Sequence, residues 1–154
     1  METIQKKKVN TLEITTARFG KISVIEDSII TMHTGMPGFS DRKNFIILEQ
    51  KEFLPLYWYQ CIDDPDLAFI IINPYLFMPN YVTDIKKVIS DMKWNKDDIK
   101  EIKVYTVVNA SSGNPKEMTA NLMGPLFINL SCNEAVQVVF PDSPYSIQHK
   151  LFKE

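Results

Sequence analysis

Three aspartates, Asp63, Asp64 and Asp66, crowd the turn CIDDPDLA between two apolar stretches. Two neighbouring carboxylates can serve as general acid and base only where an enclosed pocket shifts the pKa of one of them. A tight turn offers no such enclosure, and aspartate beside proline is itself a common turn signal. The pattern therefore predicts a turn, and beyond that an acidic surface for a basic partner, because opposed charges raise the rate and specificity of association.

The segment NPYLFMPNY, residues 73–81, is unusually apolar for a connection, since connections are normally polar and exposed. Its two prolines are expected to hold it extended, so that little ordering entropy is lost when a partner binds. Aromatic residues and methionine are enriched in the cores of protein interfaces. Two interpretations stay open: the segment tucks under the following helix as core, or it offers Tyr75, Phe77, Met78 and Tyr81 as a contact surface.

The histidines and cysteines give little support for catalysis or metal binding. His33 and His149 lie at opposite ends of the chain, and Cys61 and Cys132 are far apart without metal-type spacing. A Cys–His nucleophilic pair can meet only in the fold, and a cysteine in an apolar strand is more often a small core residue. Phosphate-binding glycine loops and the G-x-S-x-G nucleophile motif are absent from the sequence.

A glycine-rich turn, GMPGF, follows His33. Gly35, Pro37 and Gly38 shape it, because glycine permits a positive φ. Phe39 is then expected either to plug the end of the fold or to offer a contact.

A second bend is predicted within TANLMGPLFIN, residues 119–129. Asn121 is a polar residue in an apolar stretch, and asparagine side chains often hydrogen-bond nearby backbone. We expect Asn121 to brace the backbone across a bend that precedes Gly124 and Pro125.

Short strands account for most of the remaining sequence. Runs rich in β-branched and aromatic residues alternate with turn residues, which is typical of strands. These runs span residues 12–16, 20–27, 28–32, 44–50, 56–62, 67–72, 103–109, 126–130 and 135–140.

One segment is predicted to be helical. From Asp84 to Trp94, the apolar residues Ile85, Val88, Ile89 and Met92 recur at the spacing of one helical face. About nine or ten short strands with one amphipathic helix, at about residues 84–94, predict a mainly β fold, a small antiparallel β-barrel-like single domain. The helix is expected to close one end of the barrel or cover an open edge.

Length and charge fit one domain. The chain has 154 residues and a formal net charge of −2. Lys6, Lys7 and Lys8 predict a basic, flexible tail over residues 1–10, followed by a single domain over residues 11–154. The domain is mildly acidic, which argues against nucleic acid as the main partner. With no signal peptide and no apolar run near the roughly 20 residues of a membrane span, we expect a cytoplasmic monomer.

Four stretches together resemble the flagellar assembly factor FliW family. They occur in the family's order at compatible spacing, from about residue 12 to residue 152, and TANLMGPLFIN is the most specific. The four are HTGMPGF (33–39), AFIIINPYLFMPNY (68–81), TANLMGPLFIN (119–129) and QVVFPDSPYSIQHKLF (137–152).

The resemblance implies a bacterial cytoplasmic protein with no enzymatic activity and no cofactor, which binds two protein partners. One partner is flagellin, through its terminal segments. The other is CsrA, an RNA-binding regulator that represses flagellin translation. Flagellin occupies the family member until it is exported, and the freed protein then captures CsrA. The candidate flagellin contacts are Tyr75, Phe77, Met78, Tyr81 and Phe39, and the candidate CsrA contacts are Asp63, Asp64 and Asp66.

Two alternatives stay open at this point. A small β-barrel can bind a small ligand or a flavin. The lysine tail and the YWY run, residues 57–59, could instead bind RNA directly, with the aromatic rings stacking on bases. The mild acidity of the domain makes a purely electrostatic account of CsrA capture weak, and the purpose of the lysine tail is not evident from the sequence.

Overall fold

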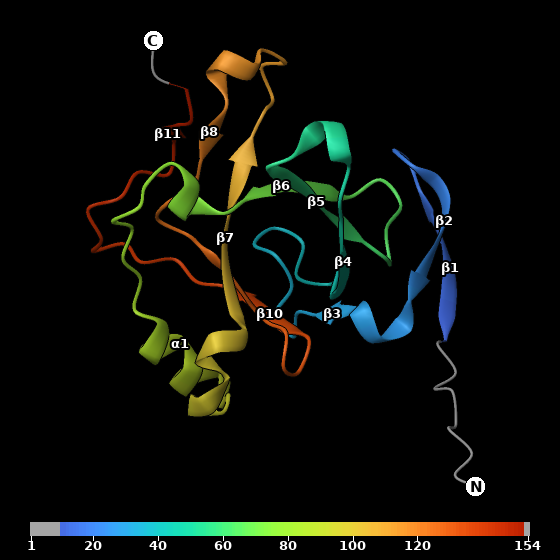
Figure 1. Cartoon of the computed structure of the whole chain (residues 1–154), viewed down its shortest axis with the longest axis horizontal. Helices are drawn as coiled ribbons and strands as arrows, with labels where there is room; N and C mark the ends of the chain where they lie inside the picture. Colours follow the sequence, from blue (N-terminus) through green and yellow to red (C-terminus); the bar gives the residue numbers. More distant parts are fainter. Residues whose placement is uncertain (1–9, 153–154) are drawn as a thin grey trace, which may run out of the picture.

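The computed structural model describes residues 10–152 of the chain. The predicted lysine tail, except for Asn10, therefore lies outside the described residues. In Figure 1, a β-barrel occupies the middle of the molecule, with helix α1 (Ile85–Met92) on one side and a separate β-hairpin on the opposite side. Within residues 10–152, no helix is long and apolar enough to cross a membrane.

Seven strands close into the barrel. They follow one another in the order β7-β6-β5-β4-β3-β10-β9, and pairing of β9 with β7 closes the ring. Strands β10 and β3 run parallel, with Glu134 opposite Thr31, whereas the other described pairs are antiparallel. The prediction of a mainly β, barrel-like domain is confirmed. The seven strands are β3 (Ile30–Thr31), β4 (Asn44–Leu48), β5 (Leu56–Cys61), β6 (Ala68–Ile72), β7 (Ile102–Asn109), β9 (Leu126–Asn129) and β10 (Glu134–Gln137).

Strand β7 continues beyond the closed ring. Its first half pairs with β9, whereas Val108 and Asn109 pair with β8 (Thr119–Ala120). Strand β8 pairs in turn with β11 (His149–Lys150), which carries the C-terminal segment back along the barrel. Neither β8 nor β11 was predicted, because each has only two residues and, unlike β3, lies in no run of β-branched residues.

The barrel interior is filled by side chains, as is usual for small barrels. Strands β5 and β4 place Tyr59 and Phe45 there with their rings stacked 4.5 Å apart. Each fully buried side chain of this size contributes about 1.5–3 kcal/mol to stability. A small ligand would therefore have to bind outside this packed interior. The buried members are Ile30, Met32, Met36, Phe45, Tyr59, Cys61, Ile71, Leu126, Ile128 and Ala135.

Helix α1 confirms the helix predicted for about residues 84–94. The Asp84 carboxylate caps its start by accepting a hydrogen bond from the Lys87 backbone N–H at 3.1 Å. The helix lies on the outer face of the barrel and does not close an end or cover an edge. Its buried Val88 and Ile89 pack there with Phe127 of β9. This face needs a cover because the outward residues of β7 and β9 are apolar.

A hairpin outside the ring completes the described strands. Strands β1 (Thr11–Thr16) and β2 (Gly20–Ile25) form their own two-stranded sheet. Ile14 and Val24 bury their side chains against Ile46 of β4, so the hairpin covers the barrel on the side away from α1. Short 3-10 helices occupy Glu26–Ser28, Lys51–Phe53, Pro74–Leu76, Lys96–Glu101 and Pro115–Glu117.

Candidate partner-binding site

The aromatic segment that follows β6 is wound into tight turns. The Asn73 side chain accepts a hydrogen bond from the Tyr75 N–H at 2.9 Å and so caps a 3-10 turn over Pro74–Leu76. The Met78 N–H then donates to the Pro74 carbonyl at 2.9 Å. The sequence prediction that the prolines hold this segment extended is wrong. Pro74 instead starts the turn, because its fixed φ suits the first position of a helix.

The same turns sort the apolar side chains into exposed and buried ones. Tyr75 and Leu76 project outward, and Leu76 is 59% exposed. Phe77 and Met78 are half-buried, with the Phe77 ring stacked 5.6 Å from His149 of β11. Tyr81 is buried at 4% exposure, which corrects the expectation that this ring faces solvent. The segment therefore belongs partly to the surface and partly to the core.

Tyr81 anchors the segment to the barrel. Its hydroxyl donates to the Leu122 carbonyl at 2.6 Å, and its ring lies 4.6 Å from Tyr145 and 6.0 Å from Tyr75. The Tyr145 hydroxyl accepts a hydrogen bond from the Val82 N–H at 2.9 Å. Burial raises the pKa of Tyr81 far above its usual range, so the phenol stays protonated and keeps donating. Tyr81 thus fixes the backbone from which Tyr75 and Val82 project.

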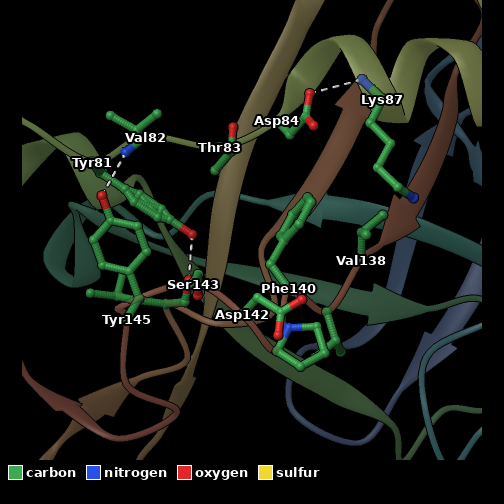
Figure 2. A pocket seen from close by; sticks show the side chains of 13 residues that line it. Tyr81, Val82, Thr83, Asp84, Lys87, Val138, Phe140, Asp142, Ser143 and Tyr145 are labelled. Carbon is green, nitrogen blue, oxygen red and sulfur yellow. Dashed lines mark hydrogen bonds between the residues drawn. The ribbon is translucent and has the colours of Figure 1, made fainter.

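A groove of about 710 Å³ opens beside this anchor, between the entry to α1 and the C-terminal segment. Figure 2 shows Tyr81 and Val82 on one side, Tyr145 and Ser143 below them, and Phe140 and Val138 further along. Val82 at the rim is 72% exposed, and Val139 also lines the groove. We call this hollow the aromatic groove. Of the residues that line it, only Tyr81 was predicted from the sequence as a partner contact, although PDSPY (141–145) also combines two prolines with a tyrosine.

The wall formed by the C-terminal segment is held by the bend at residues 121–125. The Asn121 side chain accepts a hydrogen bond from the Gly124 N–H at 2.9 Å. A Cβ on Gly124 would lie 3.0 Å from the Asn121 amide nitrogen, so glycine allows the close approach. The Pro125 carbonyl then accepts from the Val138 N–H at 3.1 Å. The bend therefore ties the start of β9 to the segment that lines the groove.

The GMPGF turn lies at one end of the barrel. Gly35 has φ +65°, and a Cβ there would lie 2.7 Å from the Phe39 carbonyl, so only glycine fits. Gly38 also has a positive φ but faces open space. Met36 is buried in the core and fills the barrel end, whereas Phe39 is 37% exposed and lies edge-on to Phe69 at 5.7 Å.

Phe39 is therefore not brought together with the aromatic segment. Phe69 lies near the start of β6, whereas Tyr75 follows the end of the same strand. A smaller hollow of about 510 Å³ includes Pro37, Phe69 and Val139. Because Val139 also lines the aromatic groove, the two hollows adjoin.

Two of the three aspartates in the acidic turn between β5 and β6 bind other residues of the protein. The Asp63 carboxylate accepts a hydrogen bond from the Asn44 backbone N–H at 3.2 Å. Asp64 is paired with Arg42 at 3.3 Å. The exposed Asp66 carboxylate has no hydrogen-bond or ion-pair partner among residues 10–152. Asp66 is thus the member of the three that is free to meet a partner.

The acidic turn and the aromatic segment lie at opposite ends of β6. The turn precedes Ala68, and the segment follows Ile72. Five residues of strand span about 13 Å. Figure 1 shows the two connections pointing to different sides of the barrel, with the acidic turn near the β1–β2 hairpin.

Glu134 on β10 contacts three polar side chains, two of them from distant positions in the sequence. Its carboxylate contacts the His33 imidazole and accepts a hydrogen bond from the Trp94 indole N–H at 2.9 Å, and the Cys132 thiol lies 3.4 Å away. The His33 contact, followed by these bonds, holds the pKa of Glu134 below its usual range. Within the described part of the chain, no group of three or more His, Cys, Asp or Glu side chains is arranged to hold a metal. Cys61 is buried among the apolar side chains of the barrel interior.

The fold and these surfaces define a class: a small closed β-barrel, with one external helix and with apolar grooves along the C-terminal segment. Comparison with known proteins then identifies the family. The family model described as FliW protein matches residues 13–151. The chain belongs to the FliW family.

Curated relatives and a solved structure agree with this assignment. The flagellar assembly factor FliW of Alkaliphilus metalliredigens is 36% identical over 90% of this chain and 85% of its own length. The Bacillus subtilis protein of the same name is 33% identical over 90% of this chain and 95% of its own length. A crystal structure of the flagellar assembly factor FliW superposes with a TM-score of 0.81 at 28% identity, covering 93% of this chain and 99% of the other.

Proposed function

We propose that this protein is a non-enzymatic flagellar assembly factor that acts as a chaperone for flagellin and as an antagonist of CsrA in the cytoplasm. Its relatives are named assembly factors, and none of those names describes a reaction. The protein works as a monomer with a single domain. Bound flagellin occupies it, and release of flagellin frees it to capture CsrA and restore flagellin translation.

The aromatic groove is the proposed binding site for flagellin. Terminal segments of flagellin expose apolar helix faces before assembly, so their partner needs an apolar surface of its own. Val82 and Val139, which line the groove, are each more than half exposed, and clustered exposed apolar residues usually mark a contact site. Because Tyr81 already fixes the surrounding backbone, little ordering entropy is lost on binding.

The acidic turn is the proposed contact for CsrA. An RNA-binding regulator presents a basic surface, and Asp66 offers it an unpaired carboxylate. Asp63 and Asp64 hold the turn in place through Asn44 and Arg42. Exposed ion pairs contribute only about 0–1 kcal/mol each. Asp66 therefore contributes mainly to association rate and orientation, and apolar contacts supply the rest of the affinity.

A competition pull-down tests this function. The purified protein is mixed with flagellin and CsrA from the same organism, each at micromolar concentration, and one partner is then titrated against the other. We expect stable binding to each partner alone and loss of CsrA as flagellin rises. Failure to form a stable complex with either partner would contradict the proposal.

A double variant and a matched control test whether flagellin binds at the groove. Val82→Glu/Val139→Glu places two charges at exposed positions that line the groove, and Ile25→Glu/Leu130→Glu places two at exposed apolar positions elsewhere. Only the first pair should lose flagellin. Equal loss with both pairs would show that binding does not depend on the groove.

A further inference from the structure

A second groove lies on the other flank of α1. Its volume is about 630 Å³, and it is lined by both the helix and the 3-10 helix that follows it. Lys87 faces the aromatic groove, whereas Lys86 faces this one. We call it the lysine groove. Its lining residues are Lys86, Ile89, Ser90, Lys93, Trp94, Lys96 and Ile99.

The floor of the lysine groove is apolar and preformed. Ile89 and Trp94 are buried against the barrel, and Ile99 is 45% exposed. The Trp94 indole N–H donates to Glu134 at 2.9 Å, which fixes the ring. The Trp94 backbone N–H also donates to the Ile89 carbonyl at 3.0 Å. An apolar partner would meet this surface without first having to order it.

Three lysines surround this floor without partners of opposite charge. Lys86, Lys93 and Lys96 are all exposed, and within residues 10–152 none of them forms an ion pair. The nearest acid on the helix, Asp91, is paired with Lys87 at 2.8 Å. Asp98, on the 3-10 helix, accepts a hydrogen bond from Asn129.

Local helix chemistry explains only part of this arrangement. Lys93 and Lys96 follow the last turn of α1, where the free carbonyls favour cations. Lys86 lies in the first turn, where a cation is disfavoured. Lys93 also has φ 57°, a left-handed conformation that a glycine would adopt at lower energy. Helix stability alone would therefore not favour a lysine at position 86, and at position 93 it favours the charge but not the backbone conformation of a lysine.

We propose that the lysine groove is a second polypeptide-binding site, and that it binds an acidic amphipathic segment of a partner protein. The apolar floor accepts the hydrophobic face of the segment, and its carboxylates meet Lys86, Lys93 and Lys96. The charge complementarity excludes a basic segment. A nucleic acid fits less well, because the aromatic residue that lines the groove, Trp94, is buried and is not free to stack on a base.

The two grooves can be occupied at once. Helix α1 separates them, and none of the residues lining one lines the other. Occupation of the lysine groove therefore goes beyond the flagellin site proposed above, and it can be measured while the aromatic groove is intact or blocked.

A peptide selection tests this inference. A library of random 16-residue peptides displayed on phage is selected on the full chain and counter-selected on the Lys86→Glu/Lys93→Glu/Lys96→Glu variant. We expect enrichment of sequences that combine Asp or Glu with apolar residues at the i, i+3 and i+4 spacing of a helix face. Failure to enrich, or enrichment of neutral or basic sequences, would overturn the proposal.

Affinity measurements with one selected peptide give the quantitative test. Lys93→Glu/Lys96→Glu should weaken binding at least about tenfold. The control Lys21→Glu/Lys51→Glu makes the same change in net charge at exposed positions outside the groove and should change binding less than about twofold. Equal losses in the two double variants would overturn the assignment.

Two further measurements separate peptide binding from loss of folding and from nucleic-acid binding. Lys86→Glu places a carboxylate in the first helical turn, where it is favoured, so weaker binding by this variant cannot come from unfolding. A 20-nucleotide RNA should not displace the peptide at equal concentration. Displacement by the RNA, with loss of RNA binding in Lys93→Glu/Lys96→Glu, would assign the groove to nucleic acid and contradict the proposal.

Discussion

The two ends of strand β6 present opposite solutions to a connection between strands. At the Ala68 end, two carboxylates of the acidic turn are bound to groups outside the turn. Asp63 accepts a hydrogen bond from the Asn44 backbone N–H, and Asp64 pairs with the Arg42 side chain. At the Ile72 end, the aromatic segment buries Tyr81 and leaves Leu76 and Tyr75 exposed. A connection can therefore be stable and still carry an open apolar surface, provided that one buried residue anchors it.

The largest expected effect comes from removing that anchor. Tyr81→Ala should lower the free energy of unfolding by about 3 kcal/mol or more, because it leaves a cavity and an unpaired Leu122 carbonyl. Urea denaturation measures the loss. Tyr75→Ala, at an exposed position of the same segment, is the control and should cost about 1 kcal/mol or less. Similar losses for both variants would show that the segment has no buried anchor.

The next effect concerns binding without loss of stability. Val82→Glu/Val139→Glu should cost about 2 kcal/mol or more of flagellin affinity, since it puts charge into an apolar contact. Titration calorimetry measures the affinity, and the melting temperature should stay within a few degrees because both side chains are exposed. A collapse of melting would mean that these residues belong to the core.

A smaller effect on stability is expected from Asp63, in the acidic turn at the other end of β6. Asp63→Ala should lower the free energy of unfolding by about 1 kcal/mol, because the Asn44 backbone N–H loses its acceptor. Chemical denaturation compares it with Asp66→Ala, which should fall within about 0.5 kcal/mol of the unchanged protein. A loss at Asp66 as large as that at Asp63 would refute the division of roles within the turn.

The smallest effect is expected from reversing the charge of Asp66. Asp66→Lys should weaken CsrA binding by a few-fold at low salt and less at high salt, because exposed charges are screened. Flagellin binding should not change. Surface plasmon resonance at two salt concentrations measures both, and equal losses for the two partners would contradict the separation of the two ends.

Much of the fold could be predicted from local sequence. Runs rich in β-branched and aromatic residues, bounded by turn residues, placed the strands of the barrel, and the 3.6-residue period placed α1 within two residues of its observed ends. The side of the barrel that α1 covers was not predictable, because it depends on the outward apolar residues of β7 and β9. Register along β7, which pairs with β9 and then β8, is likewise set by pairing between distant segments.

The candidate site was predictable only in part for the same reason. Composition identified the aromatic segment, but Tyr81 and Tyr75 are the same residue type in the same segment. Their different burial depends on Leu122, 41 residues further along, and on Tyr145. The C-terminal wall of the groove was missed because its partner across the groove is distant in sequence.

Amide hydrogen exchange on the flagellin complex tests the central claim most directly. If the aromatic groove is the contact, flagellin should slow exchange at residues 75–87 and 138–147 and leave residues 60–67 unchanged. Slower exchange at the acidic turn, with unchanged exchange along the groove, would contradict the account.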